Sequence, residues 1–374
     1  MTSHTTPAVP DLPLAGIRVV DLTSNIAAPF AGAVLADLGA DVVHVEAPAG
    51  DDSRRMAPCL GATSAYFHVV NRNKTVRRLD LRAPEGRSEL DALLAHADVL
   101  LTNLRPGKLA GHHLDADSLS TRYPRLIHGS LSAYGHEGSE RDRAGYDAVL
   151  QARTGIAHVT GAADGPPVRA GVSVLDVGAG TWLALAVLTA LFRREQTGRG
   201  GAVTTSLFET GASWVAYHVA AFEVSGQPSS RHGSGHPAFA PYGIFDTADG
   251  QICLGIGGDE LFRRLCQALG APELIDDPRY LTNPARVAAA AELRDDLQRI
   301  LGGFTSHDAV RCLTDAGVAA DVVQAPEDLL HDPQAEATGL MVDVLTPTGA
   351  ALRFPGLPIT VDGIRPGVRM PGPG

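Results

Sequence analysis

A single carboxylate stands in a run of small and apolar residues, "GVSVLDVGAG", which spans residues 171–180. This carboxylate is Asp176, and glycines surround it at positions 171, 178 and 180. Removing an ionised carboxylate from water without a partner is costly. Asp176 is therefore either a surface turn residue or a group that the chain keeps in place for chemistry, such as nucleophilic attack. The run alone does not choose between these interpretations.

Basic and amide side chains gather in two further segments. "NRNK" (71–74) ends in Lys74, and "NLRPG" (103–107) contains Asn103 and Arg105. Solvated loop residues are the default interpretation of such segments. The alternative is recognition of a phosphorylated ligand, because Lys and Arg form charge-assisted hydrogen bonds with phosphate oxygens.

A glycine-rich segment, "GIGGD", contains Gly255, Gly257 and Gly258 just before an expected helix. It is either a plain strand-to-helix turn or a loop that holds an anion. The sequence has no GxGxxG after its first expected strand, no HExxH and no GxSxG. Its four cysteines form no CxxC pair, so we expect neither a metal site nor a bound cofactor.

Composition narrows the class of protein. The chain has 374 residues, 44% hydrophobic content and a net charge of −11, which argues against nucleic-acid and anionic-membrane partners. The N-terminus lacks the basic and apolar pattern of a secretory signal. The most apolar stretch, residues 181–192, is too short to span a bilayer. We expect a soluble, cytoplasmic protein.

The first half of the chain alternates between two hydrophobic periods. Runs rich in β-branched residues predict strands at 16–23, 41–46, 75–81, 98–104 and 125–135. Helical spacing predicts helices at 24–40, 84–97 and near 115–122. This order predicts an α/β fold with an open, doubly wound, Rossmann-like parallel sheet. Ligands of such sheets bind at the carboxyl ends of strands, here followed by "TSNIAAP", "EAPAGD", "NLRPG" and "SAYGHEG".

The second half has a different pattern. Two apolar helices are expected between residues 181 and 225, and a Gly/Ser/Pro/His-rich stretch at 225–237 predicts linker and loop. A hairpin at 242–257 and an amphipathic helix at 259–270 predict a smaller α/β domain.

Eight segments, in order between about residues 12 and 360, carry a resemblance to a known family: "LAGIRVVDLT…PFAGAVLADLGADVVHVEAP", "NRNK", "LTNLRPG", "LIHGSLSAYG", "GYDAVLQARTG", "VTGAADGPP", "TGRGGAVTTSLFE" and "HPAFAPYGIFDTADG". They resemble the class III coenzyme A transferases of the CaiB/BaiF type. This is the family of formyl-CoA transferase and carnitine CoA-transferase, and it also includes the α-methylacyl-CoA racemases. The resemblance implies an acyl-CoA:carboxylate CoA-transferase, with an acyl-CoA and a carboxylic acid acceptor as its substrates.

The resemblance also implies catalytic residues. The family pattern "PPxxxGxxxxDxxxG" runs from Pro166 to Gly180 and places Asp176 at the nucleophile. Aspartyl anhydride and aspartyl-CoA thioester intermediates would follow, and small neighbours such as Gly178 and Ala179 would leave room for the thioester. Tyr146 stands where the racemases carry a proton-transferring His. A tyrosine stays protonated near neutral pH, which favours transfer over the alternative, an acyl-CoA racemase or epimerase.

Binding residues follow from the same resemblance. Coenzyme A contacts are implied at Ile26, Ala27, Lys74, Asn103, Arg105 and Asp147, and an active-site glycine loop at Gly255, Gly257 and Gly258. We expect Lys74 and Arg105 to lie at strand ends outside the core and to bind phosphate. The chain departs from the family at Ile26, where formyl-CoA transferase has Gln, and at His44 and Ala47. These departures leave a third alternative open, a non-catalytic descendant that binds coenzyme A poorly.

The family's assembly is a homodimer of interlocked rings, whose active sites use the large domain of one chain and the small domain of its partner. From this resemblance we expect a homodimer with a disordered tail at 1–11, a large domain at 12–190 completed by 326–374, linker helices at 191–225 and a small domain at 226–325.

Overall fold

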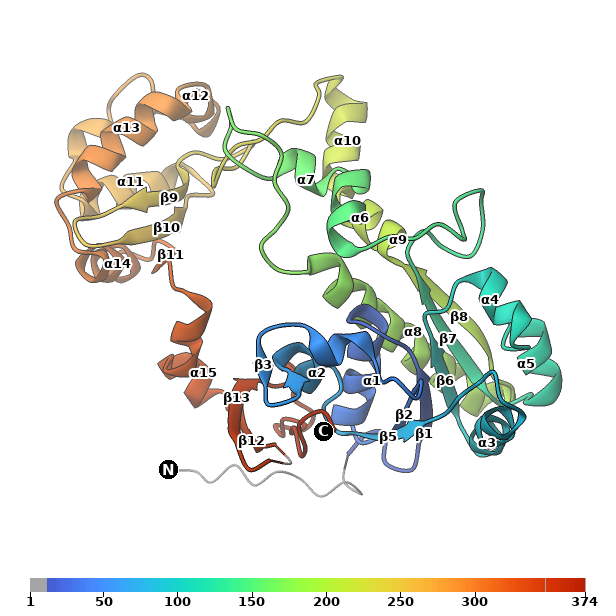
Figure 1. Ribbon diagram of the computed structural model, residues 1–374. Helices are drawn as coiled ribbons and strands as arrows, with labels where there is room; N and C mark the ends of the chain where they lie inside the picture. Colours follow the sequence, from blue (N-terminus) through green and yellow to red (C-terminus); the bar gives the residue numbers. More distant parts are fainter. Residues whose placement is uncertain (1–11, 347, 374) are drawn as a thin grey trace. The chain divides into compact units, whose positions relative to one another are not determined.

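The computed structural model describes residues 12–346 and 348–373, so the expected tail at 1–11 lies outside the described residues. The chain divides into two compact units (Figure 1). The larger unit comprises the chain up to Ile156, Ala170–Ala220 and Leu330 onward, and the smaller unit comprises Ala157–Arg169 and Ala221–Leu329.

The larger unit is built on a six-stranded sheet in which every neighbouring pair is parallel. In spatial order its strands are β5 (Lys74–Arg78), β2 (Asp41–Glu46), β1 (Arg18–Leu22), β6 (Val99–Thr102), β7 (Ile127–Ser132) and β8 (Gly201–Ser206). The chain moves outward in one direction from β1 and then in the other from β6, so the strand order reverses between these two strands. The predicted doubly wound, Rossmann-like sheet is confirmed, and its ligand-binding position is the crevice at the carboxyl ends of β1 and β6.

The sixth strand was not expected. Strand β8 lies in a region, 191–225, that was predicted to contain only linker helices, and it pairs with β7 along its whole length. Its sequence, "GAVTTS", is rich in β-branched residues, which suit a strand better than a helix. The prediction was wrong because the apolar residues around this short run suggested helix on both sides.

Two helices next to the sheet set the position of the candidate site. Helix α1 (Ala27–Asp37) follows β1, and α8 (Val174–Thr197) precedes β8; together with the strands they form the main hydrophobic core. Helix α8 has 24 residues and is long and apolar enough to cross a membrane by length and composition alone. The sequence analysis considered only residues 181–192 and so underestimated the length of this apolar helix. Half of its most apolar window is buried inside the protein, as in the core helix of a soluble domain.

Shorter elements complete the larger unit. The helices are α2 (Ala65–Val70), α3 (Pro84–Leu94), α4 (Pro106–Gly111), α5 (Ala116–Arg122), α6 (Asp147–Thr154), α9 (Leu207–Trp214) and α15 (Pro333–Ala337). Two small antiparallel pairs join β3 (Cys59–Leu60) with β4 (Thr63–Ser64), and β12 (Met341–Leu345) with β13 (Ala351–Pro355). Helices α7 (Ile156–Val159) and α10 (Ala216–Ser225) lie where the chain passes between the units.

The smaller unit has its own sheet and core. Its antiparallel strands are β9 (Tyr242–Asp246), β10 (Gln251–Gly255) and β11 (Ala320–Val322), and its helices are α11 (Asp259–Ala268), α12 (Asn283–Ala288), α13 (Ala290–Leu301) and α14 (Ser306–Asp315). The predicted hairpin is confirmed as β9 and β10. The unit also includes residues 157–169, which were expected in the large domain; the backbone N–H of Gly233 donates to the carbonyl of Gly161 at 3.0 Å.

Candidate active site

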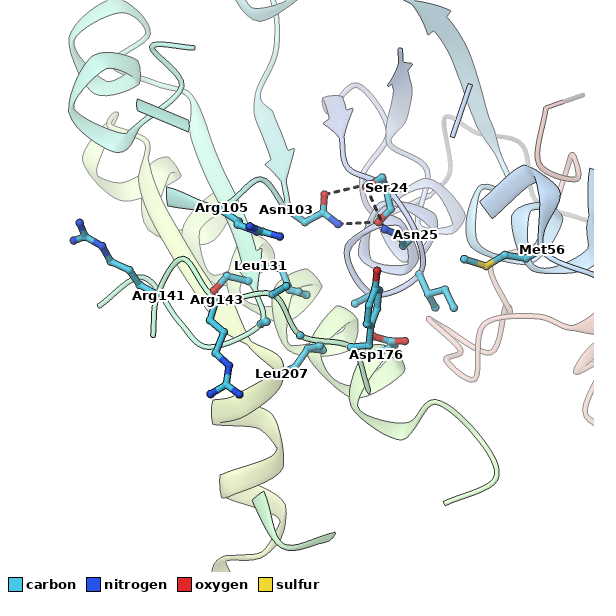
Figure 2. Close-up of a pocket in the computed structure, with 17 residues that line it drawn as sticks. Ser24, Asn25, Met56, Asn103, Arg105, Leu131, Arg141, Arg143, Asp176 and Leu207 are labelled. Carbon is cyan, nitrogen blue, oxygen red and sulfur yellow. Dashed lines mark hydrogen bonds between the residues drawn. The ribbon is translucent and has the colours of Figure 1, made fainter. Parts of the chain in front are cut away.

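A cavity of about 270 Å³ lies in the larger unit at the carboxyl ends of the strands. We call it the Asp176 cavity. It brings together six of the residues expected at the site: Ile26, Ala27, Asn103, Arg105, Tyr146 and Asp176. The segments between β1, β6 and β7 and the helices that follow them supply four of them, and Ala27 begins α1, as the doubly wound sheet predicts. Figure 2 shows Asn103 and Ser24 on one side of this cavity and Asp176 and Leu207 on another.

Asp176 belongs to the first turn of α8. Gly180 follows one turn later on the same helix face, and a Cβ atom at that glycine would lie only 2.4 Å from the carbonyl oxygen of Ala27. Only a glycine therefore lets the start of α1 approach α8 so closely. The glycine four residues after Asp176 explains how this carboxylate comes to share a cavity with the first turn of α1.

A second carboxylate lies directly behind the first. The buried Asp147, in the first turn of α6, accepts hydrogen bonds at Oδ2 from the backbone N–H groups of Leu175 (2.7 Å) and Asp176 (3.2 Å). Its Oδ1 accepts from the amide of Gln151 at 2.5 Å. Asp147 thus holds the beginning of α8 in place and brings a negative charge close to Asp176.

The surroundings of Asp176 change its acidity. Burial raises the pKa of its carboxyl group and the neighbouring Asp147 raises it further, to about 7. At neutral pH the carboxylate and the carboxylic acid are therefore present in similar amounts. A carboxyl group tuned in this way within a cavity is typical of a functional site.

The loop between β1 and α1 lines the cavity with Ser24, Asn25 and Ile26. Asn25 has a positive φ of 67°, which asparagine tolerates better than most residues. Ile26 then occupies the N-cap position of α1 and makes no side-chain capping hydrogen bond. The first N–H groups of a helix have no intrahelical acceptor, so this turn can stabilise a developing oxyanion beside Asp176.

Hydrogen bonds between Ser24 and Asn103 join the ends of β1 and β6, where the strand order of the sheet reverses. The side-chain amide of Asn103 accepts from the backbone N–H of Ser24 at 3.1 Å and donates to the carbonyl of Ser24 at 2.7 Å (Figure 2). Both residues also line a second cavity of about 490 Å³, which extends over the ends of β2 and β5 and which we call the adjoining cavity. Ser24 and Asn103 therefore lie in the walls of both cavities.

Comparison with known proteins decides the family. The sequence profile described as CoA-transferase family III matches residues 14–374. The chain is 36% identical to the succinate–glutarate CoA-transferase of Agrobacterium fabrum over 367 residues, covering 96% of this chain and 88% of that protein. It is 32% identical to the acetyl-CoA:oxalate CoA-transferase of Acetobacter aceti over 363 residues, covering 96% and 92%. The chain belongs to CoA-transferase family III.

The fold agrees with this assignment. A solved structure of a CaiB/BaiF family protein from Brucella suis matches with a TM-score of 0.87 and 35% identity, covering 97% of this chain and 96% of that one. The protein is therefore an enzyme that transfers coenzyme A between carboxylic acids, as the resemblance implied.

One expected binding residue of this CoA-transferase lies elsewhere. Lys74 was expected outside the core, but its side chain is fully buried. Its ammonium group donates to Asp21 Oδ2 (2.7 Å), the carbonyl of Pro29 (2.7 Å) and Asn71 Oδ1 (2.9 Å), which occupies all three donors. The expectation that Lys74 binds a phosphate from outside the core is wrong, because the side chain is needed inside it.

The ion pair between Lys74 and Asp21 holds the loop that lines the Asp176 cavity. Burial alone would raise the pKa of Asp21, but Lys74 and His44 reverse this and hold it well below its ordinary value. Asp21 Oδ1 in turn accepts from the backbone N–H of Thr23 at 3.2 Å. Lys74 therefore ties the end of β1 to the first turn of α1, on either side of the loop that lines the Asp176 cavity.

Gly178 and Ala179, two small residues beside Asp176, pack tightly within the larger unit. Gly178 and Ala179 were expected to leave room for a thioester, but both are buried. A Cβ atom at Gly178 would lie 2.3 Å from the ring of Trp214, and Ala179 belongs to the main core. Both residues allow α8 to pack closely against its neighbours, and their role in leaving room for a thioester stays a prediction.

His44 and Ala47, where the chain departs from the family, lie in different surroundings. His44 is buried within 4 Å of Asp21, Glu46 and Asp51, while Ala47 lines the adjoining cavity. The glycines at 255, 257 and 258 belong to the smaller unit, at the end of β10 and before α11, and their role as an active-site loop stays a prediction.

The sequence analysis missed several residues that line the Asp176 cavity: Ser24, Asn25, Met56, Arg141 and Arg143. Ser24 and Asn25 stand in "TSNIAAP", a segment already expected at a strand end. Arg141 and Arg143 lie about ten residues beyond β7, where no strand end or helical period marks them. In Figure 2 the guanidinium groups of both arginines lie away from Asp176.

Proposed function

We propose that Asp176 is the nucleophile that carries coenzyme A between the donor and acceptor acids. The observation that carries this proposal is its setting: a partly buried carboxyl group with a raised pKa, facing the free N-terminal turn of α1 across a cavity. Poor solvation makes a carboxylate more reactive, and a pKa about 7 leaves enough of it ionised at neutral pH.

The reaction proceeds through covalent steps on this residue. The Asp176 carboxylate attacks the thioester carbonyl of the acyl-CoA, the C–S bond breaks, and the thiolate of coenzyme A leaves a mixed anhydride behind. The thiolate then attacks the aspartyl carbonyl, releasing the donor acid and forming an aspartyl-CoA thioester. The acceptor carboxylate attacks that thioester, and the thiolate returns to the new acyl group, which frees Asp176.

Each attack places negative charge on a carbonyl oxygen. The N–H groups at the start of α1 are the donors best placed to stabilise it, because those at the start of α8 are already bound by Asp147. Tyr146 is exposed at the N-cap position of α6 and lines the same cavity, where it contacts substrate rather than the core.

Coenzyme A would extend from Asp176 through the adjoining cavity, passing the Ser24–Asn103 bridge. Arg105 is the cation we assign to its phosphates. Its backbone starts α4, its side chain is exposed, and the described residues offer its guanidinium no carboxylate.

Arg105→Ala should weaken coenzyme A binding by about 1–3 kcal/mol, because a charge-assisted hydrogen bond to phosphate is lost. Isothermal titration with coenzyme A measures this loss, and Arg311→Ala, an exposed arginine of α14, is the matched control. An unchanged affinity in Arg105→Ala would mean that the nucleotide is bound elsewhere.

The raised pKa of Asp176 predicts a pH dependence. Only ionised Asp176 attacks, so the kcat/KM of transfer should rise about tenfold between pH 6 and pH 8, with a midpoint near the pKa of about 7. Asp147→Asn removes the neighbouring negative charge and should move the midpoint to lower pH. A flat profile across this range in the wild type would exclude Asp176 as the titrating nucleophile.

The named relatives act on short dicarboxylic acids, namely succinate and glutarate in one and oxalate in another. We therefore propose a short dicarboxylic acid as one of the two acids here. Glutarate should be a much better acceptor than butyrate, and equal rates with the two would contradict this assignment.

We also propose a cytoplasmic homodimer of interlocked chains. Large apolar side chains on α8 and α9 are exposed in the single chain, among them Trp182, Leu185, Phe192 and Trp214. Such a patch is typical of a protein interface. Sedimentation velocity should show a dimer that persists on dilution until it unfolds, and a folded monomer would contradict the interlocked arrangement.

A further inference from the structure

The smaller unit contains a cavity of its own, of about 590 Å³. We call it the Arg231 cavity. Three segments line it: the turn at 162–164, the loop at 231–242 and the start of α13, at 290–294. The loop begins within the Gly/Ser/Pro/His-rich stretch at 225–237, which the sequence predicted as linker and loop, and the mechanism of transfer makes no use of it.

Two arginines face this cavity without a carboxylate partner. Arg231 donates through Nη1 to the carbonyl of His158 at 3.0 Å, and its Nε is buried with no hydrogen-bond partner among the described residues. Arg294 donates through Nη2 to the carbonyl of Ile244 at 2.7 Å. Within the described part of the chain neither forms an ion pair. In the same unit, six arginines do pair with carboxylates: Arg263, Arg264, Arg279, Arg286, Arg299 and Arg311.

The hydrogen bond from Arg231 to the carbonyl of His158 fixes the orientation of the guanidinium group. With Nη1 held by the carbonyl of His158 and Nε buried, Nη2 is the guanidinium nitrogen that remains for a ligand oxygen. A ligand oxygen at Nη2 would add a charge-assisted hydrogen bond to a guanidinium that has no carboxylate partner among the described residues. Asp164, which is exposed, is the one carboxylate among the described residues that line the cavity.

Another wall of the Arg231 cavity is aromatic. His236 lies with its ring centre 5.0 Å from that of Phe239 and 5.5 Å from that of Tyr242. The ring of Tyr242 lies close to Gly255, where a Cβ atom would be 2.7 Å from it. An aromatic wall beside two unpaired arginines suits a ligand that combines a short carbon chain with an anionic group.

We propose that the Arg231 cavity binds the carboxylate group of a small organic acid. The choice of a carboxylate over a phosphate rests on the proposed function, since the enzyme must take up free acids. The anionic nature of the ligand rests on the two arginines alone.

Arginine modification by phenylglyoxal, followed by peptide mass spectrometry, tests this residue by residue. The Asp176→Asn protein is used, so that the result does not depend on turnover or on the role of Asp176. Succinate at about ten times its dissociation constant should slow modification of Arg231 and Arg294 about tenfold. Modification of Arg311, the exposed control on α14, should be unchanged, with chloride added to equalise ionic strength.

Parallel samples with inorganic phosphate and with 3′,5′-ADP separate the possible anions. Arg294→Gln should reduce the protection that succinate gives to Arg231, because half of the positive charge is gone. Equal rates of Arg231 modification with and without succinate would overturn the proposal. Protection by phosphate or 3′,5′-ADP but not by succinate would overturn the carboxylate assignment.

Discussion

Asp176→Asn is expected to lower the rate of CoA transfer by at least about a thousandfold while leaving coenzyme A binding nearly unchanged. Asparagine keeps the size of the side chain but cannot form the anhydride or the aspartyl thioester. Initial rates with an acyl-CoA and an acid, measured beside coenzyme A titrations, separate the two effects. Asp343→Asn, an exposed carboxylate on β12, is the matched control and should keep full activity.

The same substitution should affect stability with a defined sign. The folded-state pKa of Asp176, about 7, lies above its ordinary value of 3.8, so folding favours the protonated form. The wild type therefore loses stability as pH rises from about 4 to about 7, and Asp176→Asn should be more stable than the wild type by about 2–4 kcal/mol at pH 8. The difference should disappear below about pH 4, where both folded and unfolded Asp176 are protonated. Urea unfolding at the two pH values measures it, and a variant less stable than wild type at pH 8 would contradict the raised pKa.

Lys74→Ala is expected to destabilise the protein by about 3–5 kcal/mol, because it leaves Asp21 buried without its cation. Gly32 shows how closely this pair is packed, since a Cβ atom there would lie 2.7 Å from Asp21 Oδ2. Lys108→Ala, on the exposed face of α4, should change stability by less than about 0.5 kcal/mol. Urea unfolding compares the two variants directly.

A second substitution distinguishes a structural lysine from a phosphate ligand. Asp21→Asn combined with Lys74→Met removes both charges and should recover part of the lost stability. If Lys74→Ala binds coenzyme A weakly because its fold is damaged, the coenzyme A affinity of the double variant should recover together with its stability. A Lys74→Ala protein of normal stability that fails to bind coenzyme A would restore the phosphate role that the burial of Lys74 argues against.

The sequence predicted much of what positions the site. Alternating strand and helix patterns predict a doubly wound sheet, and the carboxyl-end rule then selects the loops that hold Ser24, Asn103 and Tyr146. A carboxylate between glycines marked Asp176. The reason for Gly180 became visible only in three dimensions, as contact with the carbonyl of Ala27.

Other features depend on contacts that the sequence does not carry. Lys74 is buried because Asp21, 53 positions away, and the carbonyl of Pro29 enclose it, and no local pattern reports such a partner. Strand β8 was hidden because its β-branched run is short and lies between apolar helices. Residues 157–169 join the smaller unit through backbone contacts such as that of Gly161 with Gly233, which leave no mark on side-chain composition.

The central claim is that Asp176 becomes covalently attached during turnover, and trapping tests it most directly. The wild-type enzyme is incubated with succinyl-CoA or acetyl-CoA, whichever supports transfer, then treated with hydroxylamine and digested for peptide mass spectrometry. We expect a hydroxamate at residue 176 that forms only when the acyl-CoA is present. It should also form in the control variant Asp343→Asn and should be missing from Asp176→Asn. An unmodified Asp176 in an enzyme that is turning over, or a hydroxamate at another carboxylate, would contradict it.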